Sequence, residues 1–168
     1  GDGEMAVTAN EQRLTVMEMA KKHQYLARGI KTFKGHDGQT GLNATLYRED
    51  KKVATVFDDA MGGDFEWYWI DSTEEENLVA LLKDIPPALT EFDFVMGVDI
   101  DNFIDYLVDA VMNENWFKRK CKSQTLFILH DSPEGTHKVI RRPYSERIKA
   151  LLQEKFPNQI KEIINERY

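Results

Sequence analysis

Residues 41–71 constrain the fold more than any other stretch, because apolar and polar side chains alternate along them in short runs. Leu42, Ala44 and Leu46 are each separated by one residue of different character, a period of two that is typical of a half-buried strand. Residues 53–57 are rich in β-branched and aromatic side chains and follow a short polar turn. The two runs therefore predict an antiparallel pair of strands.

A third strand is expected at the end of the same stretch. Residues 58–63 contain two glycines, which tolerate positive φ and favour a longer turn. Phe65, Trp67 and Trp69 then fall on one face of the following strand. Three aromatic rings on one face form a large apolar surface. We therefore expect helices from elsewhere in the chain to cover it.

The flanking sequence predicts further strands and helices. Residues 27–34 favour a strand that would make the sheet four-stranded, and residues 125–130 and 137–141 favour a separate hairpin. Residues 86–97 are expected to form an irregular connection. Apolar residues at helical spacing predict helices that begin near Thr8, Ser72, Asp99 or Asp101, and Ser145, and a final helical segment with Ile160, Ile163 and Ile164. We expect Ser72 to cap its helix through a capping box with Glu75.

Together these patterns predict an α+β fold: an antiparallel three- to four-stranded meander plus a separate β-hairpin, packed against four to five helices. A length of 168 residues favours a single domain over residues 1–168, with residues 1–4 lying outside a natural chain that would start at Met5. A hydrophobic content of 42% argues against disorder. No run approaches the ~18 apolar residues of a membrane span. The single Cys121 fits a reducing cytoplasm.

Charge is distributed unevenly along the chain, whose net charge is −7. Residues 58–109 contain fifteen Asp or Glu and one basic residue, Lys83, whereas residues 110–168 contain twelve Lys or Arg and seven Asp or Glu. Solvated helix faces often produce such runs. The alternative is an acidic surface that recognises a basic partner.

No pattern of catalytic or metal-binding residues stands out. Asp99, Asp101 and Asp105 do not match a calcium loop, because Phe103 occupies a ligand position and no Glu closes a 12-residue frame. The aspartates of residues 58–64 suit a turn better than a magnesium site. His130, His137 and Cys121 lack the number and spacing of zinc ligands, and no serine occupies a nucleophile elbow. The sequence therefore predicts no cofactor, no metal and, more readily than an enzyme, a binding protein.

A resemblance adds context to this interpretation. A short strand, then GLNATLYREDKKVATVFDDAMGG, and later TLFILHDSPEGTHKVIRRPYSERIKALLQEKF and IKEIINERY, resemble small uncharacterised proteins encoded by phages and mobile elements. The similarity covers most of the chain from about Ile30. It implies an accessory gene product that acts in the cytoplasm of a bacterial host cell, and it implies no activity and no site residues.

Two binding hypotheses follow. The first is a non-enzymatic accessory protein that binds a host protein, for example a component of a bacterial defence system that it would inhibit. Its acidic candidate residues are Asp58, Asp59, Asp64, Glu74, Glu75, Glu76, Asp105 and Asp109. The second is a small nucleic-acid-associated protein or enzyme that uses the basic hairpin region to contact phosphates. Its candidate residues are Lys118, Arg119, Lys120, Lys122, Lys138, Arg141 and Arg142.

Overall fold

The computed structural model describes residues 6–168, so the expected start at Met5 lies outside the described residues. Contacts within the chain divide it into two compact units, Gly1–Ala110 and Val111–Tyr168, called here the N-terminal and C-terminal units. Helix α3 (Ile100–Lys120) crosses the boundary, and each half is described with its own unit. The expectation of a single domain over residues 1–168 stays a prediction.

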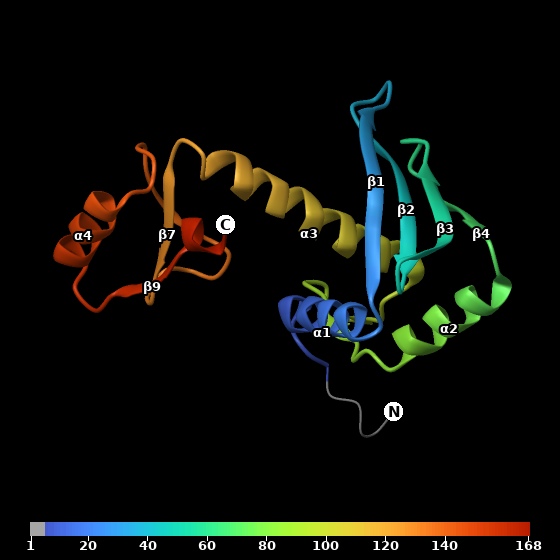
Figure 1. The fold of residues 1–168 in the computed structure, drawn as a ribbon. Helices are drawn as coiled ribbons and strands as arrows, with labels where there is room; N and C mark the ends of the chain where they lie inside the picture. The colour runs from blue at the N-terminus through green and yellow to red at the C-terminus, as the bar shows by residue number, and fades with distance from the viewer. Residues whose placement is uncertain (1–5) are drawn as a thin grey trace. The chain divides into compact units, whose positions relative to one another are not determined.

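The N-terminal unit contains the predicted meander (Figure 1). Strands β1 (Tyr25–Lys34), β2 (Thr40–Arg48), β3 (Lys51–Asp58) and β4 (Glu66–Trp69) pair antiparallel in that order, which confirms the four-stranded form. The turn between β2 and β3 consists of Glu49 and Asp50, both with positive φ. Two-residue hairpin loops of this kind match the right-handed twist of the strands.

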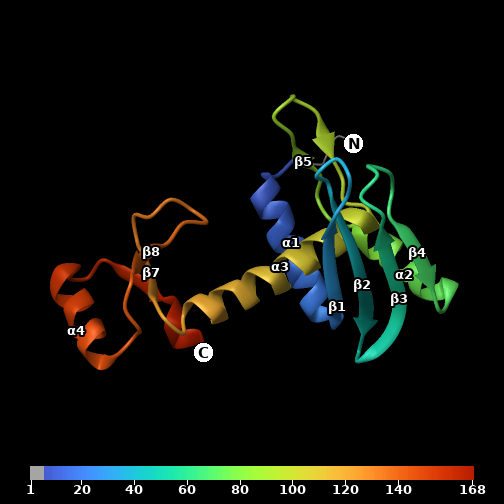
Figure 2. The same cartoon turned by 90° about the horizontal axis from the view of Figure 1, so that it is seen from above.

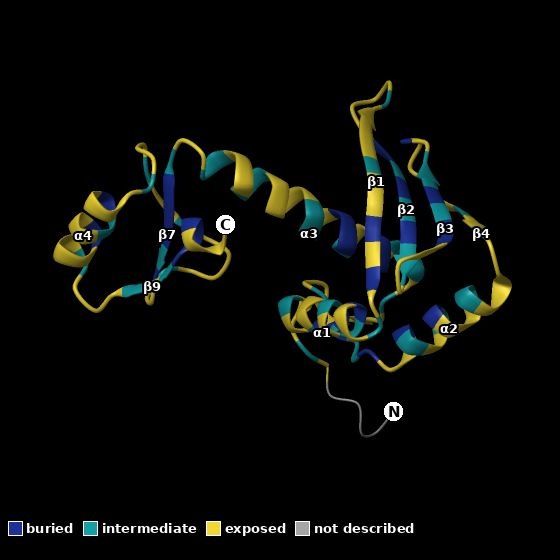
Figure 3. Ribbon diagram, viewed as in Figure 1, coloured by how far each residue is buried: buried dark blue, intermediate teal, exposed yellow. Residues whose placement is uncertain are grey.

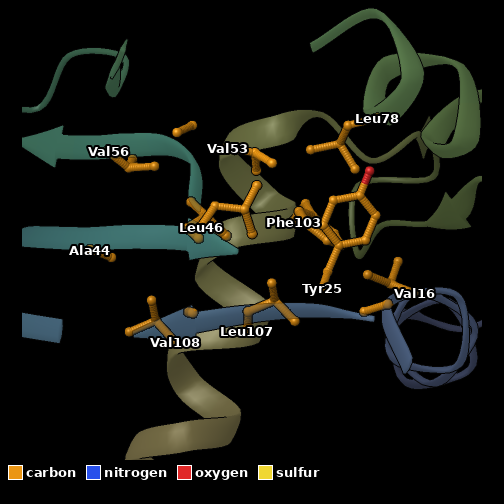
Figure 4. Packing of buried hydrophobic residues seen from close by; sticks show 14 of the residues in the cluster. Val16, Tyr25, Ala44, Leu46, Val53, Val56, Leu78, Phe103, Leu107 and Val108 are labelled. Atoms are coloured by element: carbon orange, nitrogen blue, oxygen red, sulfur yellow. The ribbon is translucent and has the colours of Figure 1, made fainter. Parts of the chain in front are cut away.

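Three helices share one hydrophobic core with the inward face of this sheet: α1 (Ala9–Lys22), α2 (Ser72–Lys83) and the first half of α3. Leu46, Leu78 and Phe103 are fully buried, and Tyr25 packs edge-on against Phe103 with ring centroids 5.4 Å apart (Figure 4). The buried residues of α3 all lie in its N-terminal half (Figure 3). Trp67 and Trp69 stack on each other and pack against the core, as their shared face predicts.

Two local predictions in the N-terminal unit are wrong. The N-cap of α2 is Asp71, whose carboxylate accepts from the Thr73 N–H at 2.8 Å, so Ser72 is the first helical residue rather than the cap. Asp and Ser cap helices about equally well, and one residue of register decides between them. The second error is residues 86–97, which are not irregular. They form a hairpin of β5 (Ala88–Leu89) and β6 (Val95–Met96), and Figure 2 shows it beside α1.

The C-terminal unit contains a second antiparallel sheet and one helix. Strands β7 (Thr125–Leu129) and β8 (Lys138–Ile140) form the predicted hairpin, and helix α4 (Glu146–Lys155) begins after its N-cap Ser145. The expected final helix is wrong: β9 (Ile160–Ile163) pairs with the other edge of β7, and only Ile164–Arg167 forms a short 3-10 helix, η1. Pairing with β7 supplies backbone hydrogen bonds that four residues of helix cannot match.

The core of the C-terminal unit is small and includes Phe127, Leu152 and Ile163. Asn165 stabilises it from inside: its Oδ1 accepts from the Leu126 N–H at 2.8 Å, and its Nδ2 donates to the carbonyls of Gln124 and Cys121. The two units together confirm the predicted α+β fold.

Within residues 6–168, every helix is too short or too polar to span a lipid bilayer.

Candidate interaction surface

The boundary between the two units coincides with the change in charge along the chain. Residues 1–110 contain 22 acidic and 10 basic residues, whereas residues 111–168 contain 7 acidic and 12 basic residues. The sequence places this change between Asp109 and Ala110, one residue from the boundary that the contacts define. The N-terminal unit is thus strongly acidic and the C-terminal unit moderately basic.

Four aspartates of the N-terminal unit act electrostatically on Asp105, and we call the five residues the aspartate cluster: Asp58, Asp99, Asp101, Asp105 and Asp109. Asp101, Asp105 and Asp109 are four residues apart on α3 and therefore neighbours along one side of the helix. Asp58 comes from the end of β3. Partial loss of hydration, and then the carboxylates around it, raise the pKa of Asp105 from 3.8 to about 6.

Three members of the cluster have a structural role. Asp58 accepts the N–H of Ala60 at 3.1 Å in the turn after β3. Asp101 accepts the N–H of Phe65 at 3.1 Å and the indole N–H of Trp67 at 2.7 Å, which ties β4 to α3. Asp99 caps α3: its carboxylate accepts from the Asn102 N–H, and its own N–H donates to the Asn102 side chain. The sequence allowed either Asp99 or Asp101 as the N-cap of this helix. In the structure the N-cap is Asp99.

The other acidic candidates lie outside this cluster. Glu74 is only 17% exposed, and its carboxylate receives two hydrogen bonds from Arg48 at 2.6 and 2.8 Å, which lower the pKa of Glu74. Glu74 is therefore paired with Arg48 and mostly covered, and its role in partner binding stays a prediction. Glu75 and Glu76 follow it in the first turns of α2. Asp59 and Asp64 are exposed on the turn between β3 and β4.

The β5–β6 hairpin is a candidate that the sequence analysis missed. Its large apolar side chains are all at least half exposed, and Phe92 reaches 73%. They are Leu89, Phe92, Phe94, Val95 and Met96. The rings of Phe92 and Phe94 stack with centroids 6.3 Å apart. One sequence pattern could have pointed to this hairpin: acidic and aromatic residues alternate from Glu91 through Phe92 and Asp93 to Phe94.

The base of this hairpin is held in place by a buried polar side chain. Gln12 of α1 is buried, and its Nε2 donates to the carbonyl of Pro86 at 3.0 Å and to that of Met96 at 2.9 Å. Pro86 precedes β5, and Met96 is the last residue of β6. The exposed apolar residues are therefore carried by an anchored element rather than by a free loop.

The basic candidates all belong to the C-terminal unit. The last turn of α3 contains three of them, Lys118, Arg119 and Lys120. The helix dipole stabilises positive charge at this end of a helix. Lys118 lies over the Tyr168 ring and Lys120 over the Trp116 ring, each 5.8 Å from the centroid. The other four basic candidates are exposed, after α3 or along β8 and the residues that follow it: Lys122, Lys138, Arg141 and Arg142.

The candidate metal ligands do not converge. Within residues 6–168, no three His, Cys, Asp or Glu side chains are placed to share a metal ion. His137 packs instead against the rings of Trp116 and Phe117, at 5.7 and 5.5 Å between centroids. The absence of a metal and of a cofactor stays a prediction.

Comparison with known proteins gives no relative from which to transfer a role. No protein-family model, no curated protein and no solved structure matches the chain. Any function must therefore be argued from the surfaces described above.

Proposed function

We propose that this chain is a non-enzymatic accessory protein that binds a basic host protein in the cytoplasm of a bacterial cell. The aspartate cluster would be its recognition surface. A component of a bacterial defence system, which the chain would inhibit, is the partner to test first. The proposal is supported by charge and exposure in the N-terminal unit.

One observation carries the proposal: the carboxylates of the cluster are not neutralised. Each of the four charged groups that act on Asp105 is itself a carboxylate. None of the ion pairs among residues 6–168 includes a member of the cluster. Repulsion among like charges lowers stability, and a basic partner would relieve it. Such a surface steers a partner of opposite charge and raises the rate of association.

The hairpin supplies the apolar contacts that charge alone does not provide. Protein interfaces usually combine an apolar, aromatic centre with a polar rim, and exposed apolar patches mark interaction sites. Phe92 and Phe94 would form such a centre, with Glu91 and Asp93 as an acidic rim. A partner with an apolar groove bordered by Lys or Arg would suit both the hairpin and the cluster.

The experiment begins with capture of a partner from a bacterial lysate and continues with the purified pair. Association kinetics are then measured for the wild-type chain and for Asp105→Asn/Asp109→Asn. Because the Debye length falls from ~10 Å at 0.1 M salt to ~3 Å at 1 M, we expect the variant to associate roughly tenfold more slowly at low salt and with a weaker salt dependence. Phe92→Ser/Phe94→Ser should instead speed dissociation.

Matched variants make the test specific. Asp131→Asn/Glu154→Gln removes two exposed charges from the C-terminal unit, and Leu151→Ser removes a half-exposed apolar side chain from α4 of the same unit. Both should bind as the wild type does. A partner that associates with the Asp105/Asp109 variant at an unchanged rate and with an unchanged salt slope would refute recognition by the cluster.

The nucleic-acid alternative rests on the positive charge of the C-terminal unit. It predicts that the wild-type chain recovers nucleic acid from the lysate. Lys118→Gln/Arg119→Gln/Lys120→Gln should then abolish that recovery, whereas under the protein-binding proposal the same variant keeps its partner.

A further inference from the structure

A cavity of about 620 Å³ lies within the C-terminal unit. Its walls are the second half of α3, the end of β7, the loop between β7 and β8, β9 and η1. This volume falls in the range of ~300–1,000 Å³ that is usual for small-molecule sites. We call it the aromatic cavity, because Trp116, Phe117 and His137 form one of its sides.

The aromatic side is built from rings that support each other. Trp116 and Phe117 meet edge-on at 5.2 Å between centroids, and His137 from the β7–β8 loop lies 5.7 and 5.5 Å from them. All three residues are partly exposed. Lys120 and Arg167 lie over the Trp116 and Phe117 rings, and the parts of these rings that stay exposed can contact a planar ligand.

Three charged residues also line the cavity, the basic Lys161 and Arg167 and the acidic Glu134. Arg167 is fixed by hydrogen bonds to Glu162, and its guanidinium carbon lies 5.7 Å from the Phe117 ring centroid. Lys161 is exposed on the strand next to it and forms no ion pair among residues 6–168. Lys161 is therefore available to an anionic group, whereas the charge of Arg167 is shared with Glu162.

The loop that closes the cavity is internally braced. The hydroxyl of Ser132 accepts from the Leu129 N–H at 3.1 Å, and the hydroxyl of Thr136 donates to the Pro133 carbonyl at 2.6 Å. The Thr136 N–H also donates to that carbonyl at 3.1 Å. A wall fixed in this way needs little ordering when a ligand binds.

We propose that the aromatic cavity binds a nucleoside phosphate. The aromatic side would receive the base, and Lys161 would receive the phosphate. The net positive charge of the C-terminal unit favours an anionic ligand. A free nucleotide and a nucleotide within a single strand share this chemistry. The inference does not depend on the proposed protein partner, which concerns the other unit.

Calorimetric titration of the full chain tests the proposal. The probes are four mononucleotides in turn, AMP, GMP, CMP and UMP, and then an oligo(dA) of ten nucleotides. We expect at least one mononucleotide or the oligonucleotide to bind, with the matching nucleoside weaker by about tenfold because it lacks the phosphate. Tighter binding of the oligonucleotide than of AMP would identify a strand as the source, and the reverse would identify a free nucleotide. Both results support the site.

Two variants locate the binding. Lys161→Gln should weaken it about tenfold, whereas Lys155→Gln, an equal loss of charge on exposed α4, should leave it unchanged. Trp116→Leu keeps apolar bulk and should also weaken it by about tenfold through lost stacking. The inference is refuted if no probe binds at millimolar concentration. It is equally refuted if Lys161→Gln and Lys155→Gln weaken binding by the same factor.

Discussion

Replacing Asp105 by Asn should stabilise the N-terminal unit at neutral pH. The folded state raises the pKa of this carboxyl from 3.8 to about 6, so it disfavours the charged form. Well below pH 3.8 the group is protonated in both the folded and the unfolded chain, and its burial then has no electrostatic cost. As pH rises from 4 to 6 the unfolded chain loses the proton first, and the cost of keeping Asp105 in the fold grows until it is complete above pH 6.

The size of the effect follows from the shift. One pKa unit corresponds to ~1.4 kcal/mol, so the whole shift would correspond to about 3 kcal/mol. Asp105 is exposed, and solvent screens charges at exposed positions. A gain of about 1 kcal/mol at pH 7 is therefore the realistic expectation for Asp105→Asn. Asp and Asn have similar helix propensities, so the substitution in α3 should add little of its own.

Urea denaturation at pH 7 and pH 4 measures this gain, with Asp131→Asn in the other unit as the matched control. The gain should be present at pH 7, much smaller at pH 4, and also smaller in 1 M salt, where screening weakens repulsion between exposed carboxylates. A variant that is less stable than the wild type at pH 7, or that gains equally at both pH values, would contradict the electrostatic account of the cluster.

Three other outcomes are expected. Trp67→Phe keeps an aromatic ring but loses the 2.7 Å hydrogen bond to the Asp101 carboxylate, and urea denaturation should show a loss of about 1.5–3 kcal/mol. Asn165→Ala removes three hydrogen bonds to backbone groups from a residue that is only 7% exposed, so it should cost about 3 kcal/mol or more, and an unchanged melting curve would contradict its bracing role. EDTA, Zn²⁺, Ca²⁺ and Mg²⁺ should each leave the melting temperature within about one degree, because a native-state ligand would raise it with concentration.

The central sheet could be predicted because its information is local. The period of two in residues 42–47 indicates which side chains face inward, and the two-residue polar turn after Arg48 sets the first pairs with β3. The register shift between Leu46 and Tyr47 could not be predicted in this way. The core helices followed from apolar spacing in the same way. The Asp71 cap was missed by one residue, since Asp71 and Ser72 are both good caps and adjacent.

Features that depend on distant parts of the chain could not be predicted. Ile160, Ile163 and Ile164 have a spacing that a helix would also bury, and only the free edge of β7 makes β9 a strand. The pairing of Glu74 with Arg48 joins α2 to β2 across 26 residues of sequence. The aspartate cluster likewise needs the fold, because Asp58 and Asp105 are far apart in the chain. The sequence could therefore identify the acidic region of the chain, but not which of its residues belong to the aspartate cluster.

The structure separates the acidic residues of the N-terminal unit by what they already do. Asp71 and Asp99 cap helices, Asp101 holds β4 to α3, and Glu74 balances Arg48. These carboxylates are explained by folding and need no partner. Asp105 and its neighbour Asp109 make none of these contacts and raise the electrostatic cost of their own surroundings. If the acidic composition served only solubility, these charges would be spread apart rather than placed at successive turns of one helix. The binding proposal therefore rests on these two residues more than on the acidic run as a whole.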